Sequence, residues 1–164
     1  MLLIVSRNIL EVSSDVITMS ANPSLLSGSD ISGIIHKAAG PQLEAKAKPF
    51  APLNSGQATI TPAFNLSAKY VIHTVCPRFM DGKRGESEQL YNAYATALAL
   101  HSQASDAKSI AFVSMGTGIY KWPMALAADI AVKALLMSTF EETLMCVMDE
   151  KTRLLYQAAL DRYL

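Results

Sequence analysis

The chain has few cysteines and no net charge, and both shortages exclude classes of protein. Cys76 and Cys146 are the only cysteines in the sequence. Neither stands at a metal-ligand spacing, and each lies in or beside an apolar run, so we expect buried free thiols. Fourteen basic residues balance fourteen acidic ones, which leaves no global field to attract nucleic acid or an anionic membrane. We therefore expect neither a disulfide framework nor a binder of nucleic acid or membranes.

Long apolar runs are also missing. The apolar start at residues 1–5 has no basic lead, whereas a signal core needs roughly 7–15 residues and a membrane helix roughly 20. The sequence has no evident repeat, linker or low-complexity segment. With 164 residues and 51% hydrophobic content, the chain is long enough to bury about two thirds of its unfolded surface around one core. These limits predict a cytoplasmic protein with a single domain over residues 1–164.

Strand and helix patterns alternate along the sequence. Apolar runs of strand length lie at about 2–5, 15–20, 57–62, 69–75, 109–113 and 143–148, and helical patterns lie at about 30–39, 86–104, 123–139 and 151–163. The alternation is typical of an α/β protein whose mixed, largely parallel sheet is covered by helices on both faces. The runs at 69–75 and 109–113 contain β-branched and aromatic residues without strict alternation, as expected of central, buried strands.

Two glycine-containing loops follow predicted strands. Residues 114–123 contain Gly116 and Gly118 and lead to a helix whose first turn we expect to contain Pro123. Residues 22–33 also join a strand to a helix. Such loops present bare backbone N–H groups to an anion, and a pair of them suits a diphosphate better than a lone phosphate. For either loop the alternative is a tight turn that holds no ligand.

Single residues in and near these loops have two interpretations each. Asn22 follows a strand at the end where α/β sheets hold ligands, so its amide would address a sugar hydroxyl, although Asn22-Pro23 is equally a common turn. Tyr120 would pack on a ribose or bond a phosphate, or else pack in the core. His36 and His73 have apolar neighbours, and we expect core residues. No cluster of His, Cys, Asp or Glu suggests a metal, and we expect no cofactor.

Four runs of residues carry a resemblance to a known family. They are Asp15–Leu26, Gly33–Pro41, Tyr70–Pro77 and Gly116–Tyr120. In this order and at this spacing they resemble a macrodomain, the ADP-ribose-binding α/β/α module. The resemblance covers essentially the whole chain. It implies a three-layer α/β/α fold with a central mixed sheet and a cleft for ADP-ribose at the carboxyl ends of the central strands.

The resemblance also implies a set of ligand-binding residues, drawn from both loops and from both ends of the chain. The set is Asn8, Ile9, Ala21, Asn22, Ser27, Gly28, Ser29, Asp30, Ile31, Ser114, Gly116, Thr117, Gly118, Ile119, Tyr120 and Met148. In members that hydrolyse ADP-ribosyl esters or deacetylate O-acetyl-ADP-ribose, Asn22 and Tyr120 would orient the distal ribose and a water. The implied partner is ADP-ribose or an ADP-ribosylated protein.

Three positions depart from the family's pattern. Asn8 stands where the family usually has an aspartate that bonds the adenine amino group, and it keeps an acceptor without the charge. Asp30 places a carboxylate in a loop that is usually glycine, where it would repel a diphosphate by roughly 2–4 kcal/mol unless it caps the helix beginning at Ile31, as its position favours. Ser32 stands where hydrolytic members often carry a water-positioning aspartate, and serine cannot act as a carboxylate base.

Three functions are compatible with these residues. The first is binding of ADP-ribose, O-acetyl-ADP-ribose or an ADP-ribosylated protein. The second is hydrolysis of ADP-ribosyl esters or O-acetyl-ADP-ribose, which Ser32 weakens without excluding, because some hydrolytic members use the substrate's own phosphate and a water. The third is a degenerate macrodomain that binds no ADP-ribose and serves as an interaction module, which Asp30 and the altered residue at position 8 favour.

Overall fold

The computed structural model describes residues 1–28, 30–118 and 120–164. Its strands and helices alternate much as the sequence predicts. Within the described residues they are β1 (Leu2–Ser6), β2 (Val16–Ser20), α1 (Ile31–Ala39), α2 (Pro41–Ala47), β3 (Ala58–Pro62), β4 (Tyr70–Thr74), α3 (Glu86–Ala99), β5 (Ser109–Val113), α4 (Met124–Leu135), β6 (Glu142–Val147) and α5 (Glu150–Asp161). Short 3-10 helices lie at Ile9–Glu11, Lys48–Phe50 and Leu100–Gln103.

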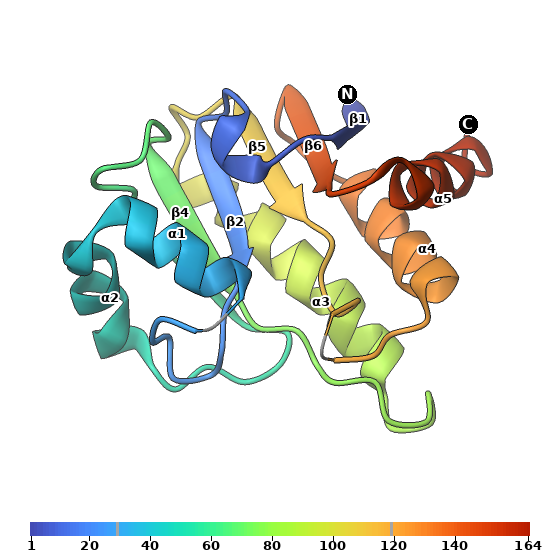
Figure 1. Ribbon diagram of the computed structural model, residues 1–164, viewed down its shortest axis with the longest axis horizontal. Coiled ribbons are helices and arrows are strands. Elements are labelled where there is room, and N and C mark those ends of the chain that lie inside the picture. Colours follow the sequence, from blue (N-terminus) through green and yellow to red (C-terminus); the bar gives the residue numbers. More distant parts are fainter. Residues whose placement is uncertain (29, 119) are drawn as a thin grey trace.

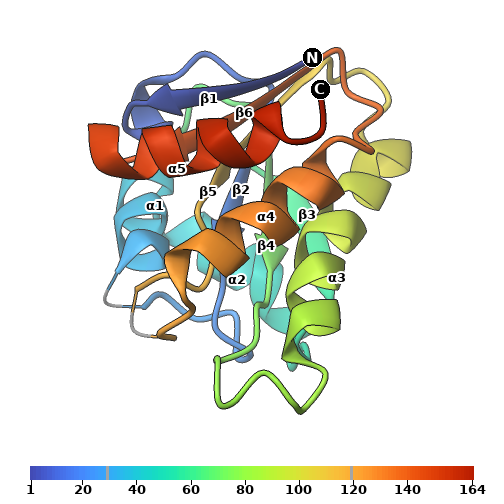
Figure 2. The same cartoon turned by 90° about the vertical axis from the view of Figure 1, so that its right-hand side faces the viewer.

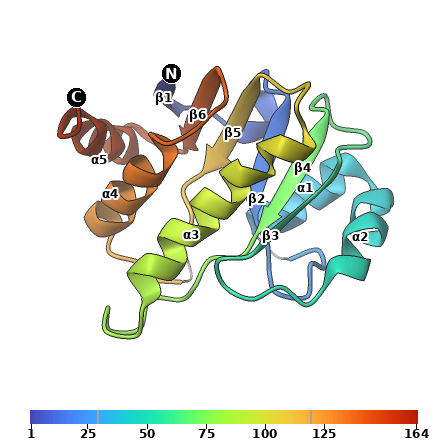
Figure 3. The same ribbon diagram turned by 180° about the vertical axis from the view of Figure 1, so that it is seen from behind.

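The strands form one mixed sheet between two layers of helices (Figure 1). Their order is β1-β6-β5-β2-β4-β3, and neighbouring strands are parallel except for β3, which pairs antiparallel with β4. The helices α1 and α2 pack on one face. On the other face lie α3, α4 and α5, side by side (Figures 2 and 3). The predicted three-layer α/β/α fold with a central mixed sheet is confirmed.

The central strands have no solvent-facing side because helices cover both faces of the sheet. In β2, Val16 packs toward α3, α4 and α5, whereas Ile17 packs toward α1 and α2. Four of the five residues of this strand are buried. A strand covered on both sides needs apolar residues on both sides, so its sequence lacks polar alternation. The continuous apolar runs therefore located the central strands correctly.

Some boundaries differ from the prediction. A second helix, α2, follows α1 directly, and the sequence patterns did not predict it. Gly40 separates the two helices with a φ of 94°, which glycine adopts readily, and Pro41 then begins α2. Pro123 lies just before α4 instead of within its first turn. The helix that begins at Glu86 ends at Ala99 and continues only as a short 3-10 helix.

The connections after β2 and β5 leave the sheet on opposite faces. The chain after β2 enters α1 on one face, and the chain after β5 enters α4 on the other. Because β2 and β5 are parallel neighbours, their carboxyl ends lie at the same edge of the sheet and the two loops diverge from there. Such divergence opens a crevice in α/β sheets. No helix in the described ranges is long and apolar enough to cross a membrane.

Candidate functional site

Two adjoining cavities lie where the loops after β2 and β5 diverge. The Asn22 cavity has a volume of about 350 Å³ and is lined by Ser20, Ala21, Asn22, Gly28, Asp30, Ile31, Ser32, Ser114, Gly116, Gly118 and Tyr120. The Asn8 cavity has a volume of about 340 Å³ and is lined by Arg7, Asn8, Ile9, Ile31, Ile34, Val113, Ser114, Thr117, Gly118, Met124, Cys146, Val147, Met148, Asp149 and Thr152. Ile31, Ser114 and Gly118 line both, so the two cavities form one elongated cleft.

Most of the residues that the resemblance implied line this cleft. Ser27 does not, because it is exposed on the loop and its backbone N–H donates to the Glu44 carboxylate at 2.8 Å. Ser29 and Ile119 lie outside the described residues. Which of the lining residues contact a ligand stays a prediction.

The cleft also contains residues that the sequence reasoning did not single out. They are Arg7, Ser20, Ile34, Val113, Met124, Cys146, Val147, Asp149 and Thr152. Six of them, namely Arg7, Ser20, Val113, Cys146, Val147 and Asp149, lie within two residues of the carboxyl ends of β1, β2, β5 and β6. Ligands of α/β sheets lie beyond the carboxyl ends of the strands, so applying that rule to every strand would have found this majority.

Ser32 holds the loop after β2 in shape. Its hydroxyl accepts a hydrogen bond from the Gly28 N–H at 3.0 Å, and the residue is 3% exposed. Close packing explains the neighbouring glycine, since a Cβ added to Gly33 would lie 2.1 Å from the Gly28 carbonyl oxygen. Ser32 therefore has a structural role in this loop, and it supplies no carboxylate to the cleft.

Asp30 caps α1, as its position before the helix predicted. Its Oδ1 accepts a long hydrogen bond, 3.4 Å, from the Ser32 N–H. The side chain is nevertheless exposed and borders the Asn22 cavity. Among the described residues that line this cavity, Asp30 supplies the single carboxylate. Capping therefore leaves a negative charge beside the cavity.

The amide of Asn22 is bound within its own loop. Its Nδ2 donates to the Leu26 carbonyl at 2.7 Å, and its Oδ1 accepts from the Ser24 hydroxyl at 2.6 Å and the Leu26 N–H at 3.2 Å. This is the turn-forming role that the Asn-Pro sequence allowed. Asn22 also lines the cavity, and an amide nitrogen carries two hydrogens, so a ligand contact is compatible with the turn.

The loop after β5 folds over a buried tryptophan. Gly116 has a φ of 85°, and a Cβ there would lie 2.5 Å from Cδ1 of Trp122. The Trp122 N–H donates to the Gly116 carbonyl at 3.0 Å, and its indole N–H donates to the Pro77 carbonyl at 2.9 Å. Only glycine fits position 116 without strain, because both its backbone conformation and the nearby ring exclude a side chain.

No such structural reason requires glycine at position 118. A Cβ added there meets no atom within 4 Å, and the residue lines both cavities. No described residue accepts a hydrogen bond from the backbone N–H of Gly116, Thr117 or Gly118. N–H groups presented in this way by a glycine-containing loop suit an anion.

The Asn8 cavity is largely apolar. Ile9 is buried at 2% exposure, whereas Met148 is 77% exposed at the edge of the cavity. Asn8 Oδ1 accepts from the Leu10 N–H at 2.9 Å and so caps the short helix that follows. Burial raises the pKa of Cys146 to about 11, so it is a neutral thiol. An apolar slot with one amide suits a flat heteroaromatic ring.

Tyr120 lines the Asn22 cavity. The guanidinium carbon of Arg78 lies 5.8 Å from the centre of the Tyr120 ring, within the range of a cation–π contact. Burial raises the pKa of the Tyr120 phenol above its ordinary value, and the nearby Arg78 acts in the opposite direction. The phenol is therefore neutral near pH 7 and is able to donate a hydrogen bond.

The histidines predicted to be core residues lie outside the cleft. The rings of His36 and His73 are buried 6.2 Å apart, and burial lowers the pKa of both, that of His73 to about 3. Cys76 and Cys146 are buried free thiols, as expected. Within the described part of the chain, no group of three His, Cys, Asp or Glu residues could hold a metal ion.

A larger hollow of about 580 Å³ lies apart from the cleft, where α3 meets the end of α4. It is lined mainly by apolar side chains such as Leu98 and Met137. Its histidine, His101, bonds the Thr139 hydroxyl at 2.7 Å and the Ala107 carbonyl at 2.9 Å. This hollow has neither a glycine loop nor a strand end, so we place the functional site in the cleft.

Comparisons with known proteins identify the family. The family model for the Macro domain matches residues 19–131. The chain belongs to the macro domain family. This macrodomain is 42% identical over 134 residues to a protein of Escherichia fergusonii named O-acetyl-ADP-ribose deacetylase, a match that covers 79% of this chain and 75% of that protein. It is 40% identical over 132 residues to a macro domain-containing protein of Lactiplantibacillus plantarum, covering 80% and 76% of the two chains.

Solved structures give the same result for the fold. A variant of the Oceanobacillus iheyensis macrodomain with ADPR superposes on this macrodomain with a TM-score of 0.90 and 31% sequence identity. The match covers 99% of this chain and 92% of the other.

Proposed function

We propose that this macrodomain binds ADP-ribose, free or attached to a protein, along the cleft. The observation that carries the proposal is the pairing of two cavities of about 340 and 350 Å³ that share Ile31, Ser114 and Gly118. A ligand with a flat base, a diphosphate and a second sugar matches this series. The apolar Asn8 cavity suits the adenine, and the Asn22 cavity suits the distal ribose.

The diphosphate would lie at the junction of the cavities. There the backbone N–H groups of Gly116, Thr117 and Gly118 have no acceptor among the described residues, and the first turn of α1 adds the positive end of a helix. The similarity to a solved macrodomain with ADPR, at a TM-score of 0.90, supports this placement.

Isothermal calorimetry with ADP-ribose, ADP and AMP tests the proposal. We expect measurable heat with ADP-ribose and weaker binding of AMP, because AMP leaves the Asn22 cavity empty. No heat from ADP-ribose at millimolar concentration would contradict the proposal. That outcome would favour the degenerate macrodomain, which acts through interactions of its surface.

Hydrolysis of an ADP-ribosyl ester or of O-acetyl-ADP-ribose is a second candidate. The 42% identity to a protein named O-acetyl-ADP-ribose deacetylase favours it. The cleft gives it less support: Ser32 is buried in a loop contact, and Asp30 is the single described carboxylate in the Asn22 cavity. Asn22 and Tyr120 would orient the distal ribose and the water.

Release of acetate from O-acetyl-ADP-ribose measures this activity. We expect Asn22→Ala to lower turnover at least about tenfold, which is about 1.4 kcal/mol of barrier. Because the Asn22 amide also holds its loop, the affinity for ADP-ribose must be measured on the same variant. Unchanged turnover would contradict the role of Asn22.

A cytoplasmic location is also proposed, and cell fractionation with an antibody against the chain checks it.

A further inference from the structure

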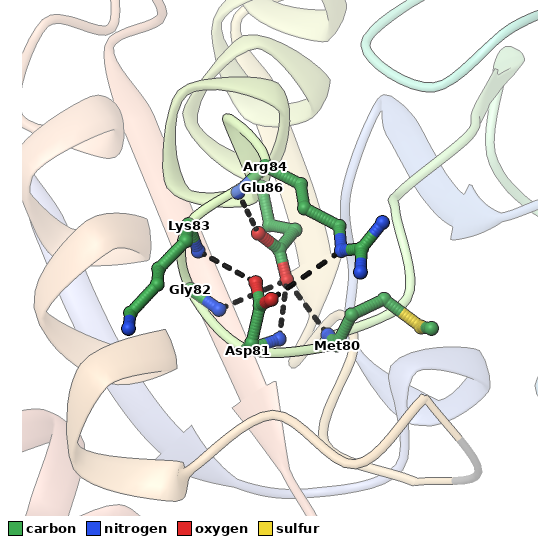
Figure 4. Close-up of polar contacts among 6 residues, drawn as sticks. All are labelled: Met80, Asp81, Gly82, Lys83, Arg84 and Glu86. Carbon is green, nitrogen blue, oxygen red and sulfur yellow. Dashed lines mark hydrogen bonds and ion pairs between the residues drawn. The ribbon is translucent and has the colours of Figure 1, made fainter.

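The segment between β4 and α3 contains a loop of residues 78–85, which we name the basic loop. It is held by the carboxylate of Glu86, the first residue of α3 (Figure 4). This carboxylate accepts hydrogen bonds from the backbone N–H groups of Met80, Asp81, Gly82 and Arg84 at 2.7, 3.0, 3.1 and 2.7 Å. Four bonds to one charged acceptor fix the course of the backbone, so the loop presents its side chains in a defined arrangement.

The basic loop is attached to the wall of the Asn22 cavity. The Phe79 N–H donates to the Tyr120 carbonyl at 3.0 Å, and the Phe79 ring packs on Trp122 with ring centres 5.1 Å apart. Beside them, the guanidinium of Arg78 lies over the ring of Tyr120, which lines the cavity. The basic loop therefore borders the cavity in which we place the distal ribose.

The exposed charge of the basic loop is mainly positive. Arg78, Lys83 and Arg84 are exposed, against one exposed carboxylate, Asp81, which lies 3.4 Å from the Arg84 guanidinium. Glu86 is 3% exposed, and backbone N–H groups stabilise its negative charge, so the net charge of residues 78–86 is +1. The whole chain has no net charge, so the cationic excess at this edge of the cleft is local.

The loop contains two residue types that are enriched at protein–protein interfaces, whereas Lys83 and Asp81 belong to types that are depleted there. Met80 is 62% exposed between the cations, and arginine and methionine are both enriched at protein–protein interfaces. Proteins that bind single-stranded nucleic acid combine a positively charged groove with exposed aromatic rings on which the bases stack. The aromatic ring of this loop, Phe79, instead packs on Trp122. A protein partner therefore fits better than a nucleic acid.

From these contacts we propose that the basic loop binds an acidic segment of an ADP-ribosylated protein, next to the modified side chain. The inference rests on the proposed function, because the ADP-ribose group brings the segment to the loop. Arg78 and Lys83 supply the charge, since Arg84 is already paired with Asp81. Exposed charges at the edge of an interface act mainly on partner choice and association rate.

Two ADP-ribosylated peptides test the proposal. Both carry the same modified residue, one with aspartate and glutamate on either side and one with serine and glycine, and fluorescence anisotropy measures the ratio of their dissociation constants. We expect the wild type to prefer the acidic peptide by about threefold to tenfold at low salt, and the preference to shrink as salt screens the charges. The ratio cancels any effect of a substitution on the ADP-ribose contact itself.

Charge reversal sharpens the test. The variant Arg78→Glu/Lys83→Glu should lose the preference and favour a lysine-flanked peptide. The control Lys133→Glu changes a charge in the last turn of α4. That end of the helix lies away from the basic loop (Figure 1), so this variant should keep the wild-type ratio. A thermal melt of each variant verifies folding.

Each contrary result has a separate meaning. Absence of any binding to free ADP-ribose overturns the proposed function. Normal binding of ADP-ribose with equal affinity for both peptides overturns only the inference about the basic loop. Competition by single-stranded oligonucleotide at the concentration of the acidic peptide, lost in the charge-reversed variant, assigns the loop to nucleic acid instead and overturns the proposal.

Discussion

At the scale of single residues, two glycines of the same loop have different reasons to be glycine. Gly116 has a φ of 85° and contacts Trp122, whereas a Cβ on Gly118 would meet no atom. We predict that Gly116→Ala lowers the melting temperature, because the alanine combines backbone strain with a clash.

Gly118→Ala should leave the melting temperature unchanged and weaken ADP-ribose binding, since its methyl group enters the space of the ligand. Equal binding by Gly118→Ala and the wild type would show that no ligand approaches position 118.

Asp30 combines a structural and an electrostatic effect that two substitutions separate. Asparagine is also a good N-cap, so Asp30→Asn should keep the stability of α1 while removing a negative charge beside the Asn22 cavity. We predict about threefold tighter ADP-ribose binding, a modest gain because the group is exposed and screened by salt. Asp30→Ala should gain the same affinity and lose about 1 kcal/mol of stability with the cap.

Calorimetry and urea unfolding measure the two effects of these Asp30 variants. Weaker binding by Asp30→Asn would contradict the repulsion and would mean that the carboxylate contacts the ligand directly.

At the scale of elements, the first residue of α3 determines the shape of the loop before it. The Glu86 carboxylate accepts hydrogen bonds from four backbone N–H groups. These bonds lower the pKa of its carboxyl from the ordinary 4.5 to about 2. The charged form is therefore favoured in the folded protein, and its contribution to stability is complete above pH 4.5 and is lost as the pH falls toward 2. We predict that Glu86→Ala speeds amide exchange about tenfold at Met80, Asp81, Gly82 and Arg84.

Glu88→Ala is the matched control for this exchange experiment. Glu88 lies two residues further along the same helix, and its side chain is exposed. Amides of the loop that exchange equally fast in the wild type and Glu86→Ala would show that the carboxylate does not fix the loop.

At the scale of the whole molecule, the buried histidines couple stability to pH. The folded state lowers the pKa of His73 from 6.5 to about 3 by burial, so between these values the unfolded chain binds a proton that the folded chain does not. Stability therefore rises with pH across this window and is lost below pH 6.5. We predict a loss of about 2 kcal/mol from His73 between neutral pH and pH 5.

Urea unfolding at several pH values measures this slope. His36, whose pKa burial also lowers, adds to the slope in the same direction. His73→Gln should reduce the slope, whatever its effect on stability at neutral pH. An unchanged slope in that variant would mean that other groups cause the acid sensitivity.

Much of the fold was predictable because the central strands are buried on both faces. Their continuous apolar runs located β2, β4 and β5, and the alternation with helical patterns predicted the three layers. Two details were not predictable from periodicity. The helix α2 has only seven residues, too few for a clear helical pattern. The burial of Glu86 was not predictable either, because the N–H groups that bond its carboxylate come from the loop before the helix.

The candidate site was likewise predictable from the sequence only in part. The strand–loop–helix pattern predicted the two loops, and Asp30 before the apolar run of α1 predicted its own cap, since a cap depends on neighbours in the sequence. Arg7, which follows β1, and Cys146, in β6, were missed because the strand-end rule was not applied to every strand. Thr152 was missed because it reaches the cleft from α5, which is distant in sequence from both loops. The turn role of Asn22 also needed coordinates, because its interpretation depended on whether the amide bonded Leu26 or stayed free.

The sequence by itself determined which segments are strands and which are helices, the three layers of the fold and the family. These depend on local periodicity and on motifs in a fixed order. Only the tertiary structure decided that two cavities join at Ile31, Ser114 and Gly118, that Ser32 is a structural contact in its loop, and that a cationic loop borders the Tyr120 ring. Each of these depends on which distant segments pack together. The packing of distant segments follows from the burial of the whole chain around one sheet, so it cannot be predicted from any single run of residues.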